Sequence, residues 1–271
     1  MTTVSFNIRR LIVAAALGLL AGGAAFASPP PVGYLAGAPL GYAVPAPPPP
    51  GGETERMDLA MVRSVQATPA SIAWQEANGD ARAYNAKDVI RRFEDATAKT
   101  LTVTERPILV GLLNKVILDT SNYAAQAKKS NPRNRPYVGH PDIAACNMNY
   151  IKDSESYPSG HAMNGYVVAA VLAEIFPERE HAILSRGIRY GDNRVVCGVH
   201  HPIDVQEGRL LGIAYLAVLR PLKPFQDDLV CAKEEAAVID KALPALSPRC
   251  AATQQDFRQQ LQLESAPKTL F

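Results

Sequence analysis

The chain has 271 residues, of which 47% are hydrophobic and 20% are charged, and its formal net charge is +2. Residues 1–27 contain two arginines and no acidic residue, so the rest of the chain has 26 basic and 26 acidic residues. This balance argues against a nucleic-acid-binding protein that relies on bulk positive charge, because such binding rests mainly on phosphate neutralisation. Any cationic site must therefore be local.

The first 27 residues have the pattern of a signal peptide. Two arginines precede an apolar run at 11–20, and a small-x-small sequence ends at Ala27. The glycines, alanines and prolines that follow favour a cleaved signal over a retained membrane anchor. We therefore expect a periplasmic or secreted protein with no integral membrane span in the mature chain.

Residues 28–54 are rich in proline. Nine of the 22 prolines of the chain lie between residues 29 and 54, with Gly, Ala and Tyr among them. Such a composition is typical of an extended polyproline linker, and we expect it to add nothing to a packed core.

Residues 55–225 have the periodicity of helices. After residue 104, apolar residues recur at i, i+3 and i+4, and similar stripes follow residues 160 and 202. No segment alternates in the manner of a strand bounded by hairpin turns. The sequence therefore predicts one all-α domain, a single helical bundle, over 55–225 and a less certain helical tail over 226–271. The expected helix starts are Thr68-Pro69, Thr104, Ser159, Glu178 and Pro202. The helix that starts at Glu178 is expected to end at about Tyr190.

Four cysteines in an exported chain suggest two disulfides, with three pairings open. We favour Cys146–Cys197, which would join two regions that carry motifs, and Cys231–Cys250, which would close a short C-terminal loop. No Cys-x2-Cys or Cys/His pair has the spacing of zinc ligands, so no metal site is expected.

Three short segments together carry the chemistry of a phosphate site. They are Lys128-x6-Arg135-Pro136, the Pro-Ser-Gly-His sequence at 158–161, and Arg194-x5-His200-x3-Asp204. Hydrolysis of a phosphate ester without a metal needs positive charge for the dianion, a nucleophile and an acid for the leaving group. The three segments supply all of these groups, although each alone would be unconvincing.

The residues of these segments suggest individual roles. A carboxylate at Asp204, one turn after His200, would fix the tautomer of that imidazole and leave its other nitrogen free to attack. His161 would then be the acid, and His201 a helix cap or pocket wall. The alternative is an ordinary helix cap, a surface His–Asp pair and solvated cations. The expected phosphate-binding residues are Lys128, Arg135, Ser159, Gly160 and Arg194.

In this combination the chain resembles the three-part signature of the phosphatidic acid phosphatase type 2 superfamily, K-x6-RP, PSGH and SR-x5-H-x3-D. Within it, residues 75–222 look most like the secreted bacterial class A non-specific acid phosphatases. One position departs from the signature, because Asn193 stands where the family has Ser. Its longer side chain puts the position of Arg194 in question.

The resemblance implies an all-α fold, a phosphohistidine intermediate on His200 and a general acid at His161. It also implies an enzyme without metal or cofactor that acts broadly on small phosphomonoesters, sometimes with phosphotransfer to alcohols. Because one imidazole must be neutral and the other protonated, we expect a bell-shaped pH dependence with an acidic optimum.

Two other readings stay open at this point. The same site in a vanadium-dependent haloperoxidase holds vanadate, although this chain is short for those enzymes. A non-catalytic periplasmic phosphate-binding protein with a decayed site is the second alternative, and Asn193 is the feature that leans toward it. The physiological substrate and a homo-oligomeric state are not predicted by the sequence.

Overall fold

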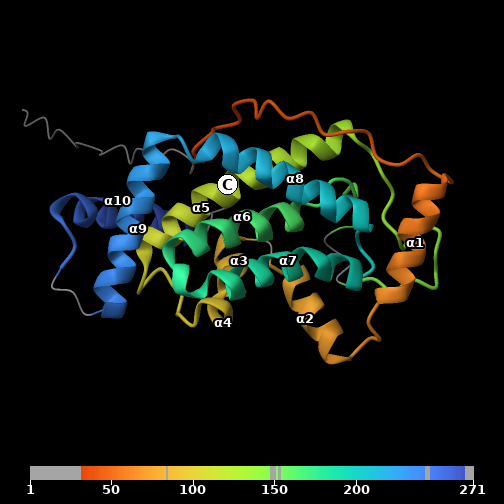
Figure 1. Ribbon diagram of the computed structural model, residues 1–271, viewed down its shortest axis with the longest axis horizontal. Coiled ribbons are helices and arrows are strands. Elements are labelled where there is room, and N and C mark those ends of the chain that lie inside the picture. The colour runs from red at the N-terminus through yellow and green to blue at the C-terminus, as the bar shows by residue number, and fades with distance from the viewer. Residues whose placement is uncertain (1–31, 84, 147–150, 152–153, 242–244, 266–271) are drawn as a thin grey trace, which may run out of the picture. The chain divides into compact units, whose positions relative to one another are not determined.

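The computed structural model describes residues 32–83, 85–146, 151, 154–241 and 245–265, which belong to one compact unit. All regular elements of the described residues are helices (Figure 1), which confirms the all-α expectation. They are α1 (Glu53–Val65), α2 (Ile72–Ala81), α3 (Ala86–Arg91), α4 (Glu94–Thr97), α5 (Pro107–Ser130), α6 (Gly160–Ile175), α7 (Glu180–Val196), α8 (Pro202–Leu219), α9 (Lys223–Lys241), α10 (Pro248–Ser265) and a 3-10 turn at Pro177–Arg179.

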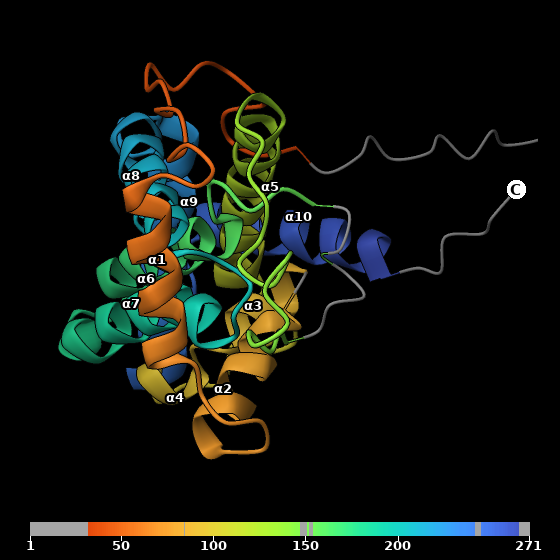
Figure 2. The same ribbon diagram turned by 90° about the vertical axis from the view of Figure 1, so that its right-hand side faces the viewer.

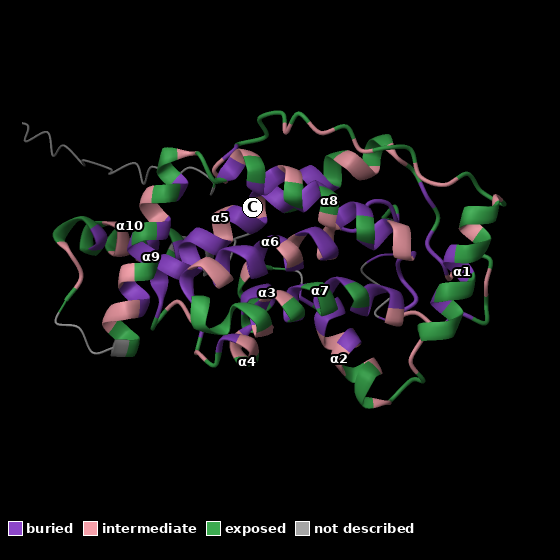
Figure 3. Cartoon of the chain, in the orientation of Figure 1, coloured by how far each residue is buried: buried purple, intermediate pink, exposed green. Residues whose placement is uncertain are grey.

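The bundle is organised around α6, which packs against α5, α7 and α8. Small and branched apolar residues occur on most sides of α6, as expected for a helix surrounded by others. Figure 3 shows the buried residues gathered where α5, α6 and α8 meet. The N-terminus of α6, which carries the Ser-Gly turn, is thereby held by its neighbours.

Two helices begin later than expected. The helix expected at Thr68-Pro69 begins at Ile72, because Ala70 has a positive φ of 72° and Ser71 is the N-cap that accepts from Trp74 N. The helix expected at Thr104 begins at Pro107, which occupies the first helical position.

Helix α7 extends further than its apolar pattern suggested. We expected it to run from Glu178 to Tyr190, whereas it continues to Val196 after the 3-10 turn. Asn193 and Arg194 consequently lie in its last turn, and both are buried.

The proline-rich segment does not behave as the spacer that we expected. Leu35 is buried in the main core, and its N–H donates to Asp119 of α5 at 3.0 Å. Tyr42 Oη donates to Glu207 of α8, and Pro45 O accepts from Tyr157 Oη at 3.0 Å. From residue 32 onward this segment runs as an extended strap over the helices (Figure 1), and these contacts of Leu35, Tyr42 and Pro45 hold it there.

The C-terminal helices are part of the core and not a separate tail. The boundary expected at 226 falls inside α9, and Phe257 and Leu261 of α10 are buried in the main hydrophobic cluster. The disulfide Cys231–Cys250 joins α9 to α10. The second disulfide is Cys146–Cys197, so the pairing that we favoured is confirmed.

The expected signal peptide, residues 1–27, lies outside the described residues. Within the described part of the chain, no helix has both the length and the apolar character to cross a bilayer.

Candidate active site

The Ser-Gly turn forms the N-terminus of α6. Ser159 is the N-cap, and its side chain accepts from Ala162 N at 3.3 Å. Ser159 N donates to the carbonyl of Asp204 at 2.8 Å, which ties the turn to the first turn of α8. Gly208 of α8 lies so close that a Cβ there would be 2.2 Å from Ser159 O. The N-terminus of a helix such as α6 carries partial positive charge, which suits an anion.

The third segment folds back on the end of α7. The chain turns through Gly198, whose φ of 65° favours glycine, and a Cβ there would meet Ala144 O at 2.2 Å. His200 N then donates to Arg194 O at 3.2 Å. The disulfide at Cys197 fastens the same turn to the loop that ends at Cys146. The turn within the five-residue spacer therefore brings the backbone of His200 into contact with that of Arg194.

His200 and Asp204 are paired as the sequence predicted. Nδ1 of His200 lies 3.3 Å from Oδ2 of Asp204, and the side chains are 3% and 0% exposed. Nε2 of His200 lies 3.3 Å from Nη1 of Arg135. Because a guanidinium has only donors, Nε2 must be the acceptor and Nδ1 must carry the proton toward Asp204. The lone pair of Nε2 therefore faces a cation.

Arg135 is fixed by backbone carbonyls. Its Nη1 donates to Val199 O at 2.7 Å and its Nε donates to Ser154 O at 2.9 Å. These bonds orient the planar fork of the guanidinium beside His200, a geometry that suits contact with the oxygens of an anion.

Lys128 reaches the same pocket from the last turn of α5. Its Nζ donates to the carbonyls of Glu155 at 2.5 Å and Ser156 at 3.0 Å. Burial, followed by the charge of Arg135, lowers the pKa of Lys128 to about 7. Its ammonium group is therefore poised to gain stabilisation from a negative ligand.

His161 occupies the first turn of α6. Its ring stacks on Tyr190 of α7, with ring centroids 5.8 Å apart. Burial, and then the charge of Arg194, lowers the pKa of His161 well below its ordinary value, and His200 and Arg135 contribute to the same effect. These influences place His161 in the same electrostatic pocket as His200. Burial also lowers the pKa of His200, with Arg135 as the next cause.

Asp204 is ionised despite complete burial. Burial alone would raise its pKa, but the hydrogen bond from His200 and the charges of His201, His200 and Arg133 hold the pKa well below its usual range. His201 is the N-cap of α8, and its N–H donates to Asp204 Oδ2 at 2.9 Å. Of the two roles that the sequence suggested for His201, a helix cap or a pocket wall, the structure shows the cap.

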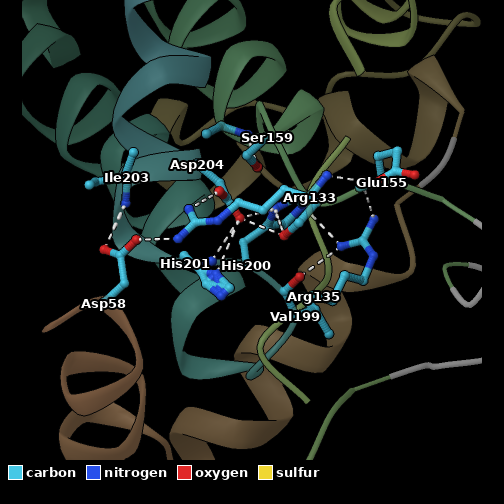
Figure 4. Close-up of polar contacts among 12 residues, drawn as sticks. Asp58, Arg133, Arg135, Glu155, Ser159, Val199, His200, His201, Ile203 and Asp204 are labelled. Atoms are coloured by element: carbon cyan, nitrogen blue, oxygen red, sulfur yellow. Dashed lines mark hydrogen bonds and ion pairs between the residues drawn. The ribbon is translucent and has the colours of Figure 1, made fainter. Parts of the chain in front are cut away.

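Sequence reasoning missed three residues that hold Asp204, two of them directly and one through Arg133. Arg133 Nη1 donates to Asp204 Oδ1 at 2.6 Å, and its Nη2 donates to Asp58 of α1 at 2.8 Å (Figure 4). Ser156 Oγ donates to Asp204 Oδ2 at 2.5 Å. Arg133 lies inside the six-residue spacer of the first segment, where its proximity to Arg135 was a usable signal. Nothing in the sequence pattern pointed to Asp58.

Asn193, the departure from the signature, contacts helix α2. Its Nδ2 donates to Asp80 Oδ2 at 2.7 Å, and the other oxygen of Asp80 accepts from Arg92 and Arg186. The longer side chain therefore reaches a buried carboxylate on α2.

The candidate site thus brings together all eight residues expected from the sequence. Within the described ranges, no group of three or more His, Cys, Asp and Glu side chains is arranged to hold a metal ion.

Comparison with known proteins shows the family of the chain. Residues 108–227 match the family model of the PAP2 superfamily, and the chain belongs to that superfamily. The chain is 32% identical over 194 residues to a non-specific acid phosphatase of Salmonella typhimurium, covering 70% of this chain and 77% of the relative. It is 35% identical over 157 residues to one of Providencia stuartii, covering 56% and 63%. An acid phosphatase of Zymomonas mobilis is 31% identical over 199 residues, covering 73% and 75%.

Within the superfamily, the chain is a member of the non-specific acid phosphatase family and thus a phosphoric monoester hydrolase. Helix α1, with Asp58, precedes the region that matches the superfamily model.

Proposed function

We propose that this acid phosphatase hydrolyses a broad range of small phosphate monoesters through a phosphohistidine formed on His200, without a metal. The observation that carries this proposal is the orientation of one imidazole. Nδ1 of His200 faces Asp204 at 3.3 Å, while Nε2 faces Arg135 at 3.3 Å. A phosphoryl group held by the guanidinium would lie next to the nucleophilic lone pair.

In the first step, Nε2 of His200 attacks phosphorus and the bond from phosphorus to the leaving oxygen breaks. The protonated ring of His161 gives its proton to that oxygen, and the alcohol departs. Asp204 stabilises the positive charge that the ring of His200 acquires. In the second step, water attacks phosphorus, its proton passes to His161, and the P–N bond breaks to release phosphate and restore neutral His200.

The cations supply the electrostatic part of catalysis. Lys128, Arg135, Arg194 and the N-terminus of α6 together surround the expected position of the phosphoryl oxygens. The same cations depress the pKa of His161. A bound phosphate dianion would offset their charge and raise that pKa, so His161 would be protonated when substrate is present. Three fixed cations also provide the charge neutralisation that a metal ion supplies in other phosphatases, which is why we propose metal-independent turnover.

Hydrolysis of p-nitrophenyl phosphate with and without EDTA tests this proposal. We expect turnover that resists EDTA, has an acidic optimum and is abolished in His200→Ala. Acid quench with a radiolabelled phosphate donor should trap phosphate on the wild-type chain and none on His200→Ala. Inactivity of the folded wild-type protein from pH 4 to 8 would reject the proposal and favour the non-catalytic alternative. Halide oxidation that depends on vanadate and peroxide, without phosphatase activity, would favour the haloperoxidase alternative.

Two further features belong to this proposal. The phosphohistidine would pass its phosphoryl group to an alcohol as well as to water, so glycerol in the assay is expected to yield a glycerol phosphate. A panel of nucleotides, sugar phosphates and pyrophosphate would define the substrate range.

We also propose export to the periplasm or the medium after cleavage behind Ala27. Both disulfides, Cys146–Cys197 and Cys231–Cys250, suit an oxidising compartment. N-terminal sequencing of the protein recovered from the periplasmic fraction should begin at Ser28. Recovery of the full chain in the cytoplasm would contradict this.

A further inference from the structure

Arg133 connects the catalytic dyad to helix α1. Its guanidinium donates to Asp204 Oδ1 at 2.6 Å through Nη1 and to Asp58 Oδ2 at 2.8 Å through Nη2. The two contacts span 71 and 75 residues of sequence. The side chains of Arg133 and Asp58 are 3% and 5% exposed, so water screens this chain of charges very little.

The same contacts fix the position of Asp58. Its other oxygen, Oδ1, accepts from Ile203 N in the first turn of α8 at 3.4 Å. Leu59 and Val62 of α1 pack with Val195 and Val205, so α1 crosses the bundle where α7 ends and α8 begins (Figures 1 and 2). Asp58 therefore sits on a docked helix and holds Arg133 from the side opposite Asp204, as Figure 4 shows.

Given the proposed function, we infer that Asp58 and Arg133 are a positioning pair that sets the orientation and basicity of Asp204 and, through it, of the nucleophile His200. Arg133 donates to Oδ1 of Asp204. The other oxygen of this carboxylate, Oδ2, contacts His200, Ser156 and the His201 N–H. The negative charge of Asp58 partly offsets the positive charge of Arg133, so Asp204 experiences a weaker positive potential. The carboxylate is thereby held ionised and in one orientation, with its charge shared between a permanent cation and the imidazole.

The two members of the pair should act on the dyad in opposite directions. Without Arg133, Asp204 and His200 both lose a nearby positive charge, so both bind a proton at higher pH. Without Asp58, the charge of Arg133 is no longer shared, so both release the proton at lower pH. Among the described residues, the other charged or titratable groups around the dyad and its neighbours are Lys128, Arg135, Glu155, Tyr157, His161, Arg194, His201 and Glu55. They stay unchanged in both variants.

The pH profile of kcat/KM tests the inference, because a merely structural pair would lower the rate without moving the profile in two directions. In Arg133→Gln we expect the acidic limb to move up by about one pH unit and kcat/KM at the optimum to fall about 10²-fold. In Asp58→Asn the acidic limb should move down by a smaller amount. In Asp58→Asn/Arg133→Gln the rate should match that of Arg133→Gln alone, because Asp58 acts through Arg133.

Two further variants control for folding and for charge. Arg63 and Asp142 form an exposed ion pair that also ties α1 to the loop after α5. Arg63→Gln/Asp142→Asn should leave the profile unchanged. Arg133→Lys keeps the positive charge but loses the planar guanidinium that contacts both carboxylates. We therefore expect a lower rate, with the acidic limb of the kcat/KM profile at its wild-type pH. The double variant Asp58→Asn/Arg133→Gln leaves neither member of the pair as a buried unpaired charge, and it tests the inference even if Arg133→Gln does not fold.

Nitrogen-15 NMR titration of His200 separates this inference from the proposed function. The His200 ring should titrate at higher pH in Arg133→Gln and in the double variant than in the wild type. That readout stands even if the wild type does not hydrolyse p-nitrophenyl phosphate, an outcome that would reject the proposed function alone. Folded variants with unshifted limbs and an unshifted His200 titration would overturn the positioning role.

Discussion

Asn193 Nδ2 donates to Asp80 Oδ2 at 2.7 Å, and both residues are buried. Asp80 also accepts from Arg92 at 2.7 Å and from Arg186 at 2.6 Å. The residue that departs from the family signature thus completes a charged cluster that fastens α2 to α7. Its role in this chain is to secure the helix that carries Arg194, and its side chain does not compete with Arg194 for the phosphate position.

Restoring the family residue should therefore cost stability more than activity. In Asn193→Ser the shorter side chain loses the bond to Asp80, and we expect the free energy of unfolding to fall by about 1–3 kcal/mol. Urea unfolding measures this loss. Arg194→Ala is the comparison, because removal of a phosphate-binding cation should reduce kcat by about 10²–10³-fold. Equal losses of kcat in the two variants would contradict the assignment of Asn193.

Asp204→Asn should separate orientation from charge in the dyad. The amide is similar in size, but it no longer holds Nδ1 of His200 protonated by charge, and it leaves Arg133 with one fewer anion. We expect kcat to fall by about 10²–10⁴-fold, as for other carboxylates that orient a catalytic imidazole. Steady-state kinetics measures the fall, and circular dichroism checks that the helices persist. Near-normal turnover would show that His200 needs no carboxylate.

Anion binding should weaken as the pH rises through neutrality. Burial and the charge of Arg135 lower the pKa of Lys128 to about 7. The side chain is therefore mostly charged below pH 7, and it progressively loses this charge above pH 7. Sulfate stays a dianion throughout this range, so its affinity reports the charge of the protein. We expect the affinity of the wild type for sulfate, measured by thermal stabilisation, to decline by up to about tenfold per pH unit above 7.

Lys128→Arg and Lys128→Met are the controls for this prediction. The arginine keeps its charge, so its sulfate affinity should depend less on pH between 6 and 9 than that of the wild type, and the remaining dependence should come from the proton that His161 gains when the anion binds. The methionine variant should bind weakly at every pH in this range. A wild-type affinity that is flat with pH would mean that Lys128 stays charged in the free enzyme.

The close approach of α8 to the Ser-Gly turn should make Gly208 sensitive to one methyl group. In Gly208→Ala, the new Cβ would lie 2.2 Å from Ser159 O, and neither backbone moves without displacing the other helix. We expect a loss of about 1–3 kcal/mol of stability from overpacking and a fall in kcat, because the N-terminus of α6 shifts. Gly212→Ala is the matched control on the same helix, since its Cβ would meet a side-chain atom of Val167 at 3.1 Å. The structural account of Gly208 fails if both variants behave alike.

The two disulfides should differ in their effect on activity. Cys146–Cys197 spans 51 residues and Cys231–Cys250 spans 19, so in a loop-entropy model their removal costs about 4 and about 3 kcal/mol. Cys197 begins the turn that leads to His200, whereas Cys231 and Cys250 join α9 to α10. We expect paired Cys→Ser replacement at 146 and 197 to reduce kcat at a temperature where both variants remain folded. The pair at 231 and 250 should retain wild-type kcat there, and an equal loss would contradict the local role of Cys197.

The sequence correctly predicted the helical class of the fold, and the structure brings the eight residues expected in the site close together. Helical periodicity is a local property, so the apolar stripes after residues 104, 160 and 202 indicated α5, α6 and α8. The starts of α2 and α5 were less predictable, because Ser71 in place of Thr68 caps α2 and Pro107 takes the first helical position of α5. The proline-rich strap and the C-terminal helices were misjudged, since packing of Leu35 or Phe257 against distant helices leaves no periodic signal.

What only the tertiary structure decided is how the site is held. Motif spacing identified His200 and Asp204 because they are four residues apart, within reach of one helical turn. Asp58 lies 75 residues away in sequence from its partner Arg133. Asp80 lies 113 residues away from its partner Asn193. Contacts at such separations depend on how the helices pack, and a single charged residue on α1 or α2 looks in sequence like any solvated one. Burial removes the water that would otherwise screen these charges. This desolvation strengthens the contacts that hold the His200–Asp204 pair and its neighbours in place.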